Sequence, residues 1–347
     1  MSTRIRGTAL ACSVAVAVGA LTGCSTGTTE AGGAPASLPT VRVGVASKSA
    51  GFLPLYIGIE KGYFAEAGVS VTEPTVLSSG ARLAAAMVGD SVDIGIGVAP
   101  DVFNLHAAGQ PVVLLGSIYA SYSVDIVAGP SINTPATADL DSKIAALSGK
   151  KIGITGPGSG TEALLSYLFK RVGRDAKTQA ELVSLGADPA AAITALRSGQ
   201  VDALSHVLSV GQQAEALGAG RLYISPGRGD VPELVGAVHG TAFSLKPVVD
   251  RKRPAVAAFL AGYQRSMRLL KSNPGEARAI AAKYLAGLSD EVIDKLLPVL
   301  AENTPAALAV DPKGFQAEAD VVYSTGLVSG SRPALADLVD PSLLPWT

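Results

Sequence analysis

Hydrophobic and polar positions follow two alternating patterns from Val41 onward. Short runs rich in valine and isoleucine, such as VRVGVA and VDIGIG, are typical of buried β-strands. Between such runs lie longer segments with apolar residues at helical spacing, such as PLYIGIEKGYFAEAG and ARLAAAMVGD, each of which predicts one helix. Strands that alternate with helices in this order predict parallel sheets covered by helices, and therefore an α/β fold.

The same order of elements recurs from Lys150. The stretch AMVGDSVD aligns without a gap with ALRSGQVD, each as a helix end, a glycine-bearing turn and the start of a strand. The last residues of these stretches, Asp93 and Asp202, therefore recur at equivalent strand starts, where a structural turn or cap is favoured over a catalytic role. The repeat predicts two lobes of like architecture.

Two segments, Pro111–Pro130 and Arg221–Pro247, each contain two strand-like runs split by small or polar residues. Each segment can therefore leave one sheet and enter the other, which makes both candidate hinges. The helix-rich remainder from Val248 is expected to pack on the first lobe.

The N-terminus has the pattern of an export signal. Arg4 and Arg6 precede an apolar run from Thr8 to Leu21, which is too short for a stable membrane-spanning helix. The run ends in LTGC, which resembles a bacterial lipobox, and this resemblance implies that Cys24 is lipidated and becomes the first mature residue. The next stretch, Ser25–Thr40, has the composition of a flexible tether. We therefore expect an exported protein, anchored by lipid to the outer face of the cytoplasmic membrane.

The predicted organisation has four parts. They are a signal peptide over 1–23, a lipidated cysteine and tether over 24–40, lobe I over 41–124 and 237–347, and lobe II over 125–236.

Composition excludes several function classes. The chain has 347 residues, 48% of them apolar and 16% charged, so it can bury a large core over two domains. The formal net charge is −1 and no basic cluster with interleaved aromatic residues occurs, so no nucleic acid partner is expected. Nothing in the sequence demands more than a monomer.

Cysteine and histidine positions give no sign of a metal site. Cys12 lies inside the predicted signal and only Cys24 survives, so neither an intrachain disulfide nor a cysteine metal site is possible. His106, His206 and His239 lack metal-ligand spacing and evident partners. We expect neither a metal nor a cofactor.

The stretch GPGSGTEALLSYLF (Gly156–Phe169) follows a strand and opens a helix. Ser159 or Thr161 can cap that helix, whose free N–H groups and dipole favour a partly negative group by roughly 0.3 to 1 kcal/mol. A nucleotide P-loop is set aside because no lysine follows the glycines, and the loose match to a dinucleotide fingerprint is weak. A helix cap without a ligand is the remaining alternative.

The loops that follow the predicted strands carry the candidate site. In open parallel sheets, ligands bind beyond the carboxyl ends of the strands, so the loops of two facing sheets converge on one cleft. Small hydroxyl-bearing residues and a few rings dominate these loops, and no G-x-S-x-G elbow or paired carboxylates stand out, so we expect no catalytic residues and no enzyme. For His206 the alternative is packing, and for Lys48 it is exposure to solvent. The candidate ligand-binding residues are Ser47, Lys48, Phe52, Ser78, Ser79, Gly80, Gly97, Tyr119, Tyr122, Ser159, Gly160, Thr161 and His206.

Four stretches together resemble one protein family. They are LPLYIGIEKGYFAEAGVSV, SSGARLAAAMVGDSVDIGIG, GPGSGTEALLSYLFKRVG and AAITALRSGQVDAL. In this combination they resemble the substrate-binding lipoproteins of ABC importers for aliphatic sulfonates, nitrate, taurine and thiamine-type pyrimidine precursors. The resemblance implies the type II periplasmic-binding-protein fold, in which two Rossmann-like α/β lobes, joined by two crossovers, hold the ligand between them. It also implies ligand contacts at Ser47–Phe52, Ser78–Gly80 and Ser159–Thr161.

The resemblance further implies a solute-binding protein that closes over one small molecule and delivers it to a membrane permease driven by an ATPase. The ligand class stays open. The loops lack an arginine anchor for a sulfonate, yet backbone N–H groups and hydroxyls can hold an anion. A neutral heterocycle is the rival, because Phe52, Tyr119 or Tyr122 can stack against it. Two enzymatic alternatives are a pyrimidine-synthesising enzyme on the same fold and an exported dinucleotide-dependent oxidoreductase.

Overall fold

The computed structural model describes residues 37–135, 137–285 and 287–343. The predicted signal peptide, Cys24 and most of the predicted tether lie outside these residues. The described residues from Leu38 onward form one compact unit.

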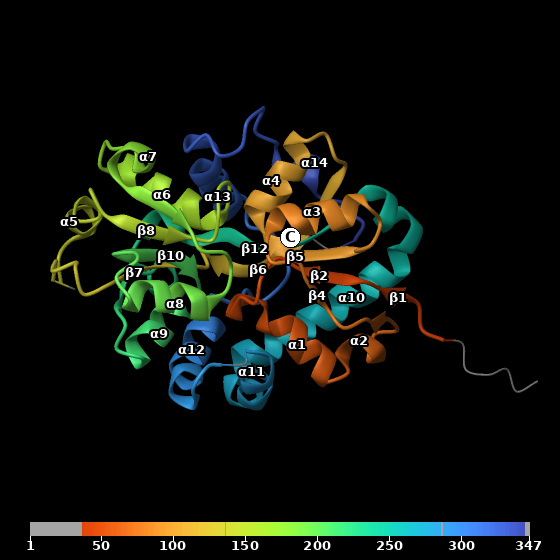
Figure 1. Ribbon diagram of the computed structural model, residues 1–347. Coiled ribbons are helices and arrows are strands. Elements are labelled where there is room, and N and C mark those ends of the chain that lie inside the picture. Colours follow the sequence, from red (N-terminus) through yellow and green to blue (C-terminus); the bar gives the residue numbers. More distant parts are fainter. Residues whose placement is uncertain (1–36, 136, 286, 344–347) are drawn as a thin grey trace, which may run out of the picture. The chain divides into compact units, whose positions relative to one another are not determined.

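Two five-stranded sheets form the framework, each with helices on its faces (Figure 1). The predicted α/β fold with two sheets is confirmed. The first sheet has the order β4 (Thr75–Val76), β2 (Val43–Val45), β5 (Ile94–Val98), β12 (Val235–Leu245) and β6 (Val112–Ser121). The second has the order β11 (Arg221–Ile224), β7 (Val124–Ala128), β10 (Ala203–Val207), β8 (Lys151–Ile154) and β9 (Glu181–Ser184). A small separate pair joins β1 (Thr40–Val41) to β3 (Ser70–Val71).

The sheets are mixed rather than purely parallel, which corrects the expectation from the strand–helix alternation. β12 runs antiparallel to β5 and β6, and β7 runs antiparallel to β10 and β11. The chain enters the second sheet at β7, directly from β6 of the first sheet, and it returns to the first sheet at β12, directly from β11 of the second. A strand that enters from the facing sheet begins at the shared edge and runs away from it, whereas the other strands run toward that edge. The two predicted crossovers therefore produce the two antiparallel strands.

Helices surround both sheets. Those in the first half of the chain are α1 (Leu53–Glu60), α2 (Tyr63–Glu66), α3 (Gly80–Val88), α4 (Ala99–Ala107), α5 (Leu140–Ala145), α6 (Gly160–Arg171) and α7 (Ala176–Gln179). Those in the second half are α8 (Pro189–Arg197), α9 (Val210–Ala216), α10 (Lys246–Ser272), α11 (Arg278–Tyr284), α12 (Asp290–Asn303), α13 (Pro312–Ser324) and α14 (Leu335–Leu338). The single helix predicted over residues 54–68 is two helices, because Gly62 adopts a φ of 70° between them.

The C-terminal helices contact both lobes, not the first alone. α10 packs on α1 and α2, as expected for the first lobe. In contrast, α12 contacts α9, and α13 contacts both β12 and α6. Val321 of α13 lies in the same apolar cluster as Ile152 of β8 and Leu164 of α6. α13 therefore joins the second crossover strand to the second lobe.

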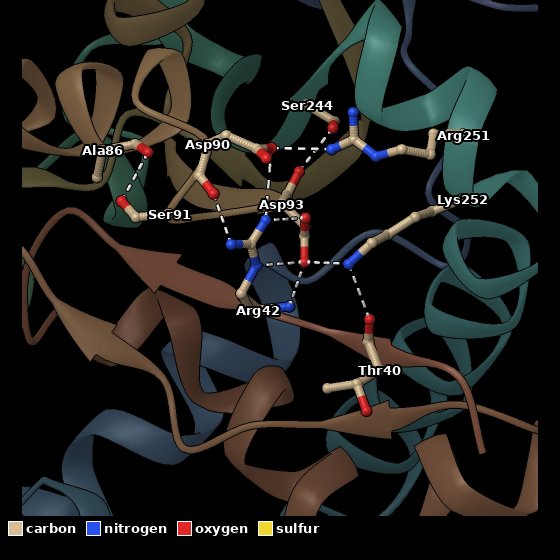
Figure 2. A network of polar contacts seen from close by, with 9 residues as sticks. All are labelled: Thr40, Arg42, Ala86, Asp90, Ser91, Asp93, Ser244, Arg251 and Lys252. Carbon is tan, nitrogen blue, oxygen red and sulfur yellow. Dashed lines mark hydrogen bonds and ion pairs between the residues drawn. The ribbon is translucent and has the colours of Figure 1, made fainter. Parts of the chain in front are cut away.

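A buried carboxylate fixes the amino end of the first sheet (Figure 2). Asp93, which precedes β5, is fully buried. Its Oδ2 accepts hydrogen bonds from the backbone N–H of Arg42 at 2.7 Å and from Lys252 Nζ at 2.8 Å. Its Oδ1 accepts from the Arg42 guanidinium at 2.7 Å. Lys252 has a non-helical conformation (φ −120°, ψ 24°) and marks a kink in α10, so the network joins the starts of β2 and β5 to this kink.

Asp202 repeats this arrangement in the second sheet. Its Oδ2 accepts from the backbone N–H of Lys151 at 2.9 Å, and its Oδ1 accepts from the Ser131 hydroxyl at 2.5 Å. The backbone N–H groups of Asp93 and Asp202 each donate in return, to the carbonyls of Arg42 and Lys151, both at 2.8 Å. Both carboxylates thus have a structural role.

Candidate functional site

A cavity of about 370 Å³ lies between the carboxyl ends of the strands of the two sheets. Ala46 follows β2, Val98 ends β5, Thr155 follows β8 and Val207 ends β10, and all four line it. This is the edge at which parallel α/β sheets bind ligands. The predicted candidates that line the cavity are Ser47, Phe52, Ser78, Ser79, Gly80, Ser159, Gly160 and Thr161.

The helix α3 begins at this cavity. Ser79 is its N-cap, and the Ser79 hydroxyl accepts from the backbone N–H of Arg82 at 3.2 Å. The preceding Ser78 has a φ of 63°, a left-handed conformation that is uncommon for a residue with a side chain. The first turn of α3 therefore directs its positive dipole end toward the cavity from the side of the first sheet.

The helix α6 begins at the opposite wall, in the glycine-rich loop. The Ser159 hydroxyl accepts from the backbone N–H of Glu162 at 3.4 Å, and Glu162 accepts from the backbone N–H of Gly158 at 2.6 Å. This exchange resembles a capping box. The Thr161 hydroxyl lies 2.7 Å from that of Ser159 and 3.0 Å from that of Thr155. These hydroxyls order the loop, and the helix opening faces the cavity.

Asp101 lies in the wall of the cavity, although the sequence analysis did not select it. Its carboxylate accepts from the backbone N–H of Val98 at 3.0 Å. A Cβ added at Gly80 would stand 1.6 Å from Asp101 Oδ1, and one at Gly97 would stand 2.5 Å from Oδ2. Both glycines therefore make room for this carboxylate. Burial raises the pKa of Asp101 to about 6, against the opposite effects of the Val98 N–H and of His239.

His239 also lines the cavity, and it has a partner that the sequence analysis missed. Its Nδ1 lies 2.9 Å from Oε1 of Glu318, and both side chains are buried. The Tyr122 ring stacks on the imidazole, with 3.7 Å between ring centroids and an angle of 29° between the planes. The Tyr122 hydroxyl donates to the carbonyl of Gly160 at 2.8 Å. The expectation that the histidines lack partners is therefore wrong for His239.

Five predicted candidates do not line this cavity. Gly97 lies behind Asp101, and Tyr122 lies behind His239. Tyr119 is buried in an apolar cluster. His206 is buried in β10, where its Nε2 lies 3.1 Å from the carbonyl of Gly186, and burial lowers its pKa to about 4. Lys48 is exposed and lines a neighbouring cavity of about 580 Å³.

That second cavity adjoins the first. Ser47, Ser78 and Ala187 line both. Lys48 and Asp188 supply its charged side chains, and Tyr284 contributes a ring. Lys48 therefore lies beside the first cavity and not in its lining.

The first cavity offers a defined chemistry. Among the described residues that line it, Asp101 carries the carboxylate, His239 the imidazole and Asn104 an amide, and none is a lysine or an arginine. Hydroxyls and the openings of α3 and α6 supply further hydrogen-bonding groups, and Phe52 supplies a ring. Within residues 37–135, 137–285 and 287–343, no three His, Cys, Asp or Glu side chains gather closely enough to hold a metal ion.

Comparisons with known proteins agree with this architecture. The family model described as NMT1/THI5 like matches residues 49–277. A Haemophilus influenzae protein whose name assigns it to thiamine biosynthesis is 27% identical over 285 residues, which cover 79% of this chain and 83% of that protein.

Solved structures of binding proteins share the fold. The alkanesulfonate-binding protein SsuA of Xanthomonas axonopodis pv. citri, bound to MOPS, superposes with a TM-score of 0.69 at 21% identity, over 88% of this chain and 99% of that one. The aliphatic sulphonate binding protein SsuA of Escherichia coli gives a TM-score of 0.68 at 19% identity, over 88% and 99% of the two chains. The periplasmic-binding-protein fold expected from the sequence is confirmed. No helix in the described part of the chain is long and apolar enough to cross a membrane.

Proposed function

Because the chain belongs to the NMT1/THI5-like family, we propose that it is the solute-binding protein of an ABC importer. It captures one small molecule in the cavity between its two sheets and presents it to a membrane permease and its ATPase. The position of the cavity, between lobes joined by two crossovers, supports capture by closure of the lobes. The fold shared with the sulfonate-binding proteins supports the same role.

The ligand class that we propose is an amino-substituted nitrogen heterocycle of the aminopyrimidine type. The observation that carries this choice is the presence of the Asp101 carboxylate in a lining without a lysine or arginine side chain. A carboxylate accepts hydrogen bonds from N–H groups and repels an isolated anion such as nitrate. Phe52 offers a ring face beside it. The Haemophilus relative's link to thiamine biosynthesis supports this choice, because thiamine contains an aminopyrimidine ring.

A zwitterionic aminosulfonate of the taurine type is the second candidate. The openings of α3 and α6 face the cavity with their positive dipole ends, which favour a partly negative group. The ammonium group of such a solute would face Asp101, and its sulfonate would face the helix openings. A plain sulfonate or nitrate would satisfy the helices but not the carboxylate.

The test uses the mature chain with Cys24→Ser, so that the protein carries no lipid. Thermal unfolding and calorimetric titration are measured with 2-methylpyrimidin-4-amine, taurine, an alkanesulfonate and nitrate. We expect the pyrimidine to raise the melting temperature and Asp101→Asn to weaken its binding at least tenfold. Asp290→Asn, an exposed acid in the first turn of α12, is the matched control. Binding of nitrate or sulfonate without binding of the pyrimidine would contradict the proposed ligand class.

A second measurement separates a carrier from the enzymatic alternatives. The bound pyrimidine is extracted after incubation and identified by mass spectrometry. A carrier returns the solute unchanged, whereas an enzyme that acts on it returns a product.

We further propose that the protein is a monomer held at the cell envelope by lipid on Cys24. The lipobox-like sequence before this residue supports the anchor. In cells, the natural chain should fractionate with membranes and Cys24→Ser should not. If both chains were found equally in the soluble fraction, the lipid anchor would be refuted. The proposed solute would not be affected by that result.

A further inference from the structure

The buried pair of His239 and Glu318 joins the cavity to a helix behind it. His239 Nδ1 lies 2.9 Å from Glu318 Oε1, and the two side chains are 1% and 0% exposed. Within the described residues, neither His239 Nε2 nor Glu318 Oε2 has a hydrogen-bond partner. Buried polar groups are nearly always hydrogen-bonded, so these two atoms require an explanation.

The surroundings fix the orientation of the imidazole. The Tyr122 ring covers one face of it. A Cβ at Gly160 would stand 3.1 Å from the ring's Cε1 and 3.4 Å from its Nε2, so this glycine leaves space beside Nε2 at the opening of α6. Glu318, on α13, does not line the cavity and reaches it only through His239. Since Nδ1 is engaged by Glu318, Nε2, which is itself buried, is the ring nitrogen that remains without a protein partner in this cavity-lining residue.

The charge of the pair decides where the protons lie. If the ring carried a proton on Nδ1 only, Glu318 would hold a full negative charge with no second hydrogen bond, in a buried position. That arrangement is costly. A second proton makes the pair neutral overall, and three forms do so. A carboxylate with an imidazolium, and a carboxylic acid that donates to Nδ1, both carry hydrogen on Nε2. In the third form the carboxyl proton sits on Oε2, which has no hydrogen-bond partner, so that form leaves a buried O–H group without an acceptor and is disfavoured.

Asp101 adds to this effect from the cavity side. Its carboxylate and His239 line the same cavity and interact electrostatically. A lone pair on Nε2 would add a second acceptor to the cavity that already holds that carboxylate, whereas an N–H group complements it.

We infer that Glu318 is a positioning residue that keeps a proton on Nε2 of His239, so that the cavity presents an N–H donor beside the carboxylate acceptor of Asp101. This inference rests on the proposed function, because its consequence is selectivity among the solutes that the cavity binds. The site recognises a solute edge that pairs a hydrogen-bond acceptor with an N–H donor. A ring nitrogen next to an amino group is such an edge, and it receives one hydrogen bond from His239 and donates one to Asp101.

Two solutes of one shape test the selectivity. They are 2-methylpyrimidin-4-amine and 3-methylaniline, which differ only in that C–H groups replace the two ring nitrogens. The mature chain with Cys24→Ser should bind the pyrimidine at least tenfold more tightly, because the aniline leaves the His239 N–H without an acceptor. In Glu318→Leu, no side-chain group at this position accepts from Nδ1 or donates to it, so nothing holds the proton on Nε2 and the preference should fall about tenfold. Asp320→Asn, at an exposed position of the same helix, should keep it.

Nitrogen-15 NMR of the imidazole tests the proton directly in the protein with Glu318 intact. The expected spectrum shows hydrogen on Nε2 of His239, identified by its loss in His239→Gln. A lone pair on Nε2 with hydrogen on Nδ1 alone would overturn the inference, as would an unchanged preference in a folded Glu318→Leu variant. If neither solute binds, the proposed ligand class fails, whereas the NMR spectrum still decides the position of the proton. The spectrum also decides it if the Glu318→Leu variant does not fold.

Discussion

Tyr122 and His239 stack with 3.7 Å between their ring centroids, and each belongs to a different crossover between the sheets. Tyr122 lies between β6 and β7, and His239 lies in β12. The proposed closure of the lobes would bend both connections, and the two touch each other at a residue that lines the cavity. A solute in contact with His239 acts on a ring that is packed against the other connection.

Tyr122→Phe keeps the stacked ring but removes the hydroxyl that donates to the Gly160 carbonyl. The half-buried carbonyl then loses a donor, so we expect the free energy of unfolding to fall by about 1 kcal/mol. Urea denaturation measures this change. Tyr167→Phe, at a half-buried position of α6, is the control and should change stability less. Equal effects of the two substitutions would show that the bond to Gly160 contributes nothing.

Gly80→Ala should abolish strong solute binding and leave the chain folded. The new Cβ would stand 1.6 Å from Asp101 Oδ1, so the carboxylate must leave its position in the wall. We expect the affinity for the pyrimidine to fall at least tenfold in a calorimetric titration. Gly156→Ala is the matched control, because Gly156 lines the same cavity and a Cβ there meets nothing within 4 Å. A Gly80→Ala protein that binds normally would remove Asp101 from the site.

Solute affinity should fall as the pH is lowered through 6. Burial raises the pKa of Asp101 to about 6, so the free protein holds the carboxylate ionised at pH 7 and mostly protonated at pH 5. An amino group of the solute needs the ionised form as its acceptor. We therefore expect about a tenfold loss of affinity between pH 7 and pH 5. The same titration with Asp101→Asn should show a weaker dependence on pH, and an equal dependence would assign the effect to another group.

Asp93→Asn should destabilise the fold at neutral pH. Although burial opposes ionisation, hydrogen bonds from Arg42 and Lys252 hold the pKa of Asp93 at about 2, below its usual 3.8. A lowered pKa contributes stability that is present above pH 4 and is lost as the pH falls through 2. The contribution is about 2 kcal/mol. Chemical denaturation at pH 7 should show a loss of at least this size.

The exposed Asp90, which also pairs with Arg42, provides the control Asp90→Asn, for which we expect a loss below about 0.5 kcal/mol. Similar losses for both variants would place the stabilisation outside Asp93.

Local patterns in the sequence predict the framework well. Short valine and isoleucine runs mark the strands, and the glycine–serine–threonine loop marks the opening of α6, because such features depend on neighbouring residues. The single helix expected over residues 54–68 is wrong because Gly62 ends α1 with a left-handed conformation. That signal was present in the sequence.

The chemistry of the cavity was harder to predict because it depends on distant residues. His239 and Glu318 are 79 positions apart, and α13, which carries Glu318, was not predicted. Asp101 lies at the start of α4, where an acidic residue is ordinary, so nothing local distinguished it from a cap. His206 is a candidate because it lies at the predicted ligand end of a strand, but its side chain is buried in the second sheet.

The matching carboxylates at the amino ends of the two sheets have a consequence for how such a protein diversifies. Asp93 and Asp202 each accept a hydrogen bond from a backbone N–H group located 51 positions earlier, so both halves contain the same stabilising contact. The cavity lies at the opposite edge of each sheet, where the loops differ between the halves. Substitutions in those loops can therefore change the solute that is bound while both carboxylate contacts stay unchanged. One framework can in this way evolve to bind many different solutes.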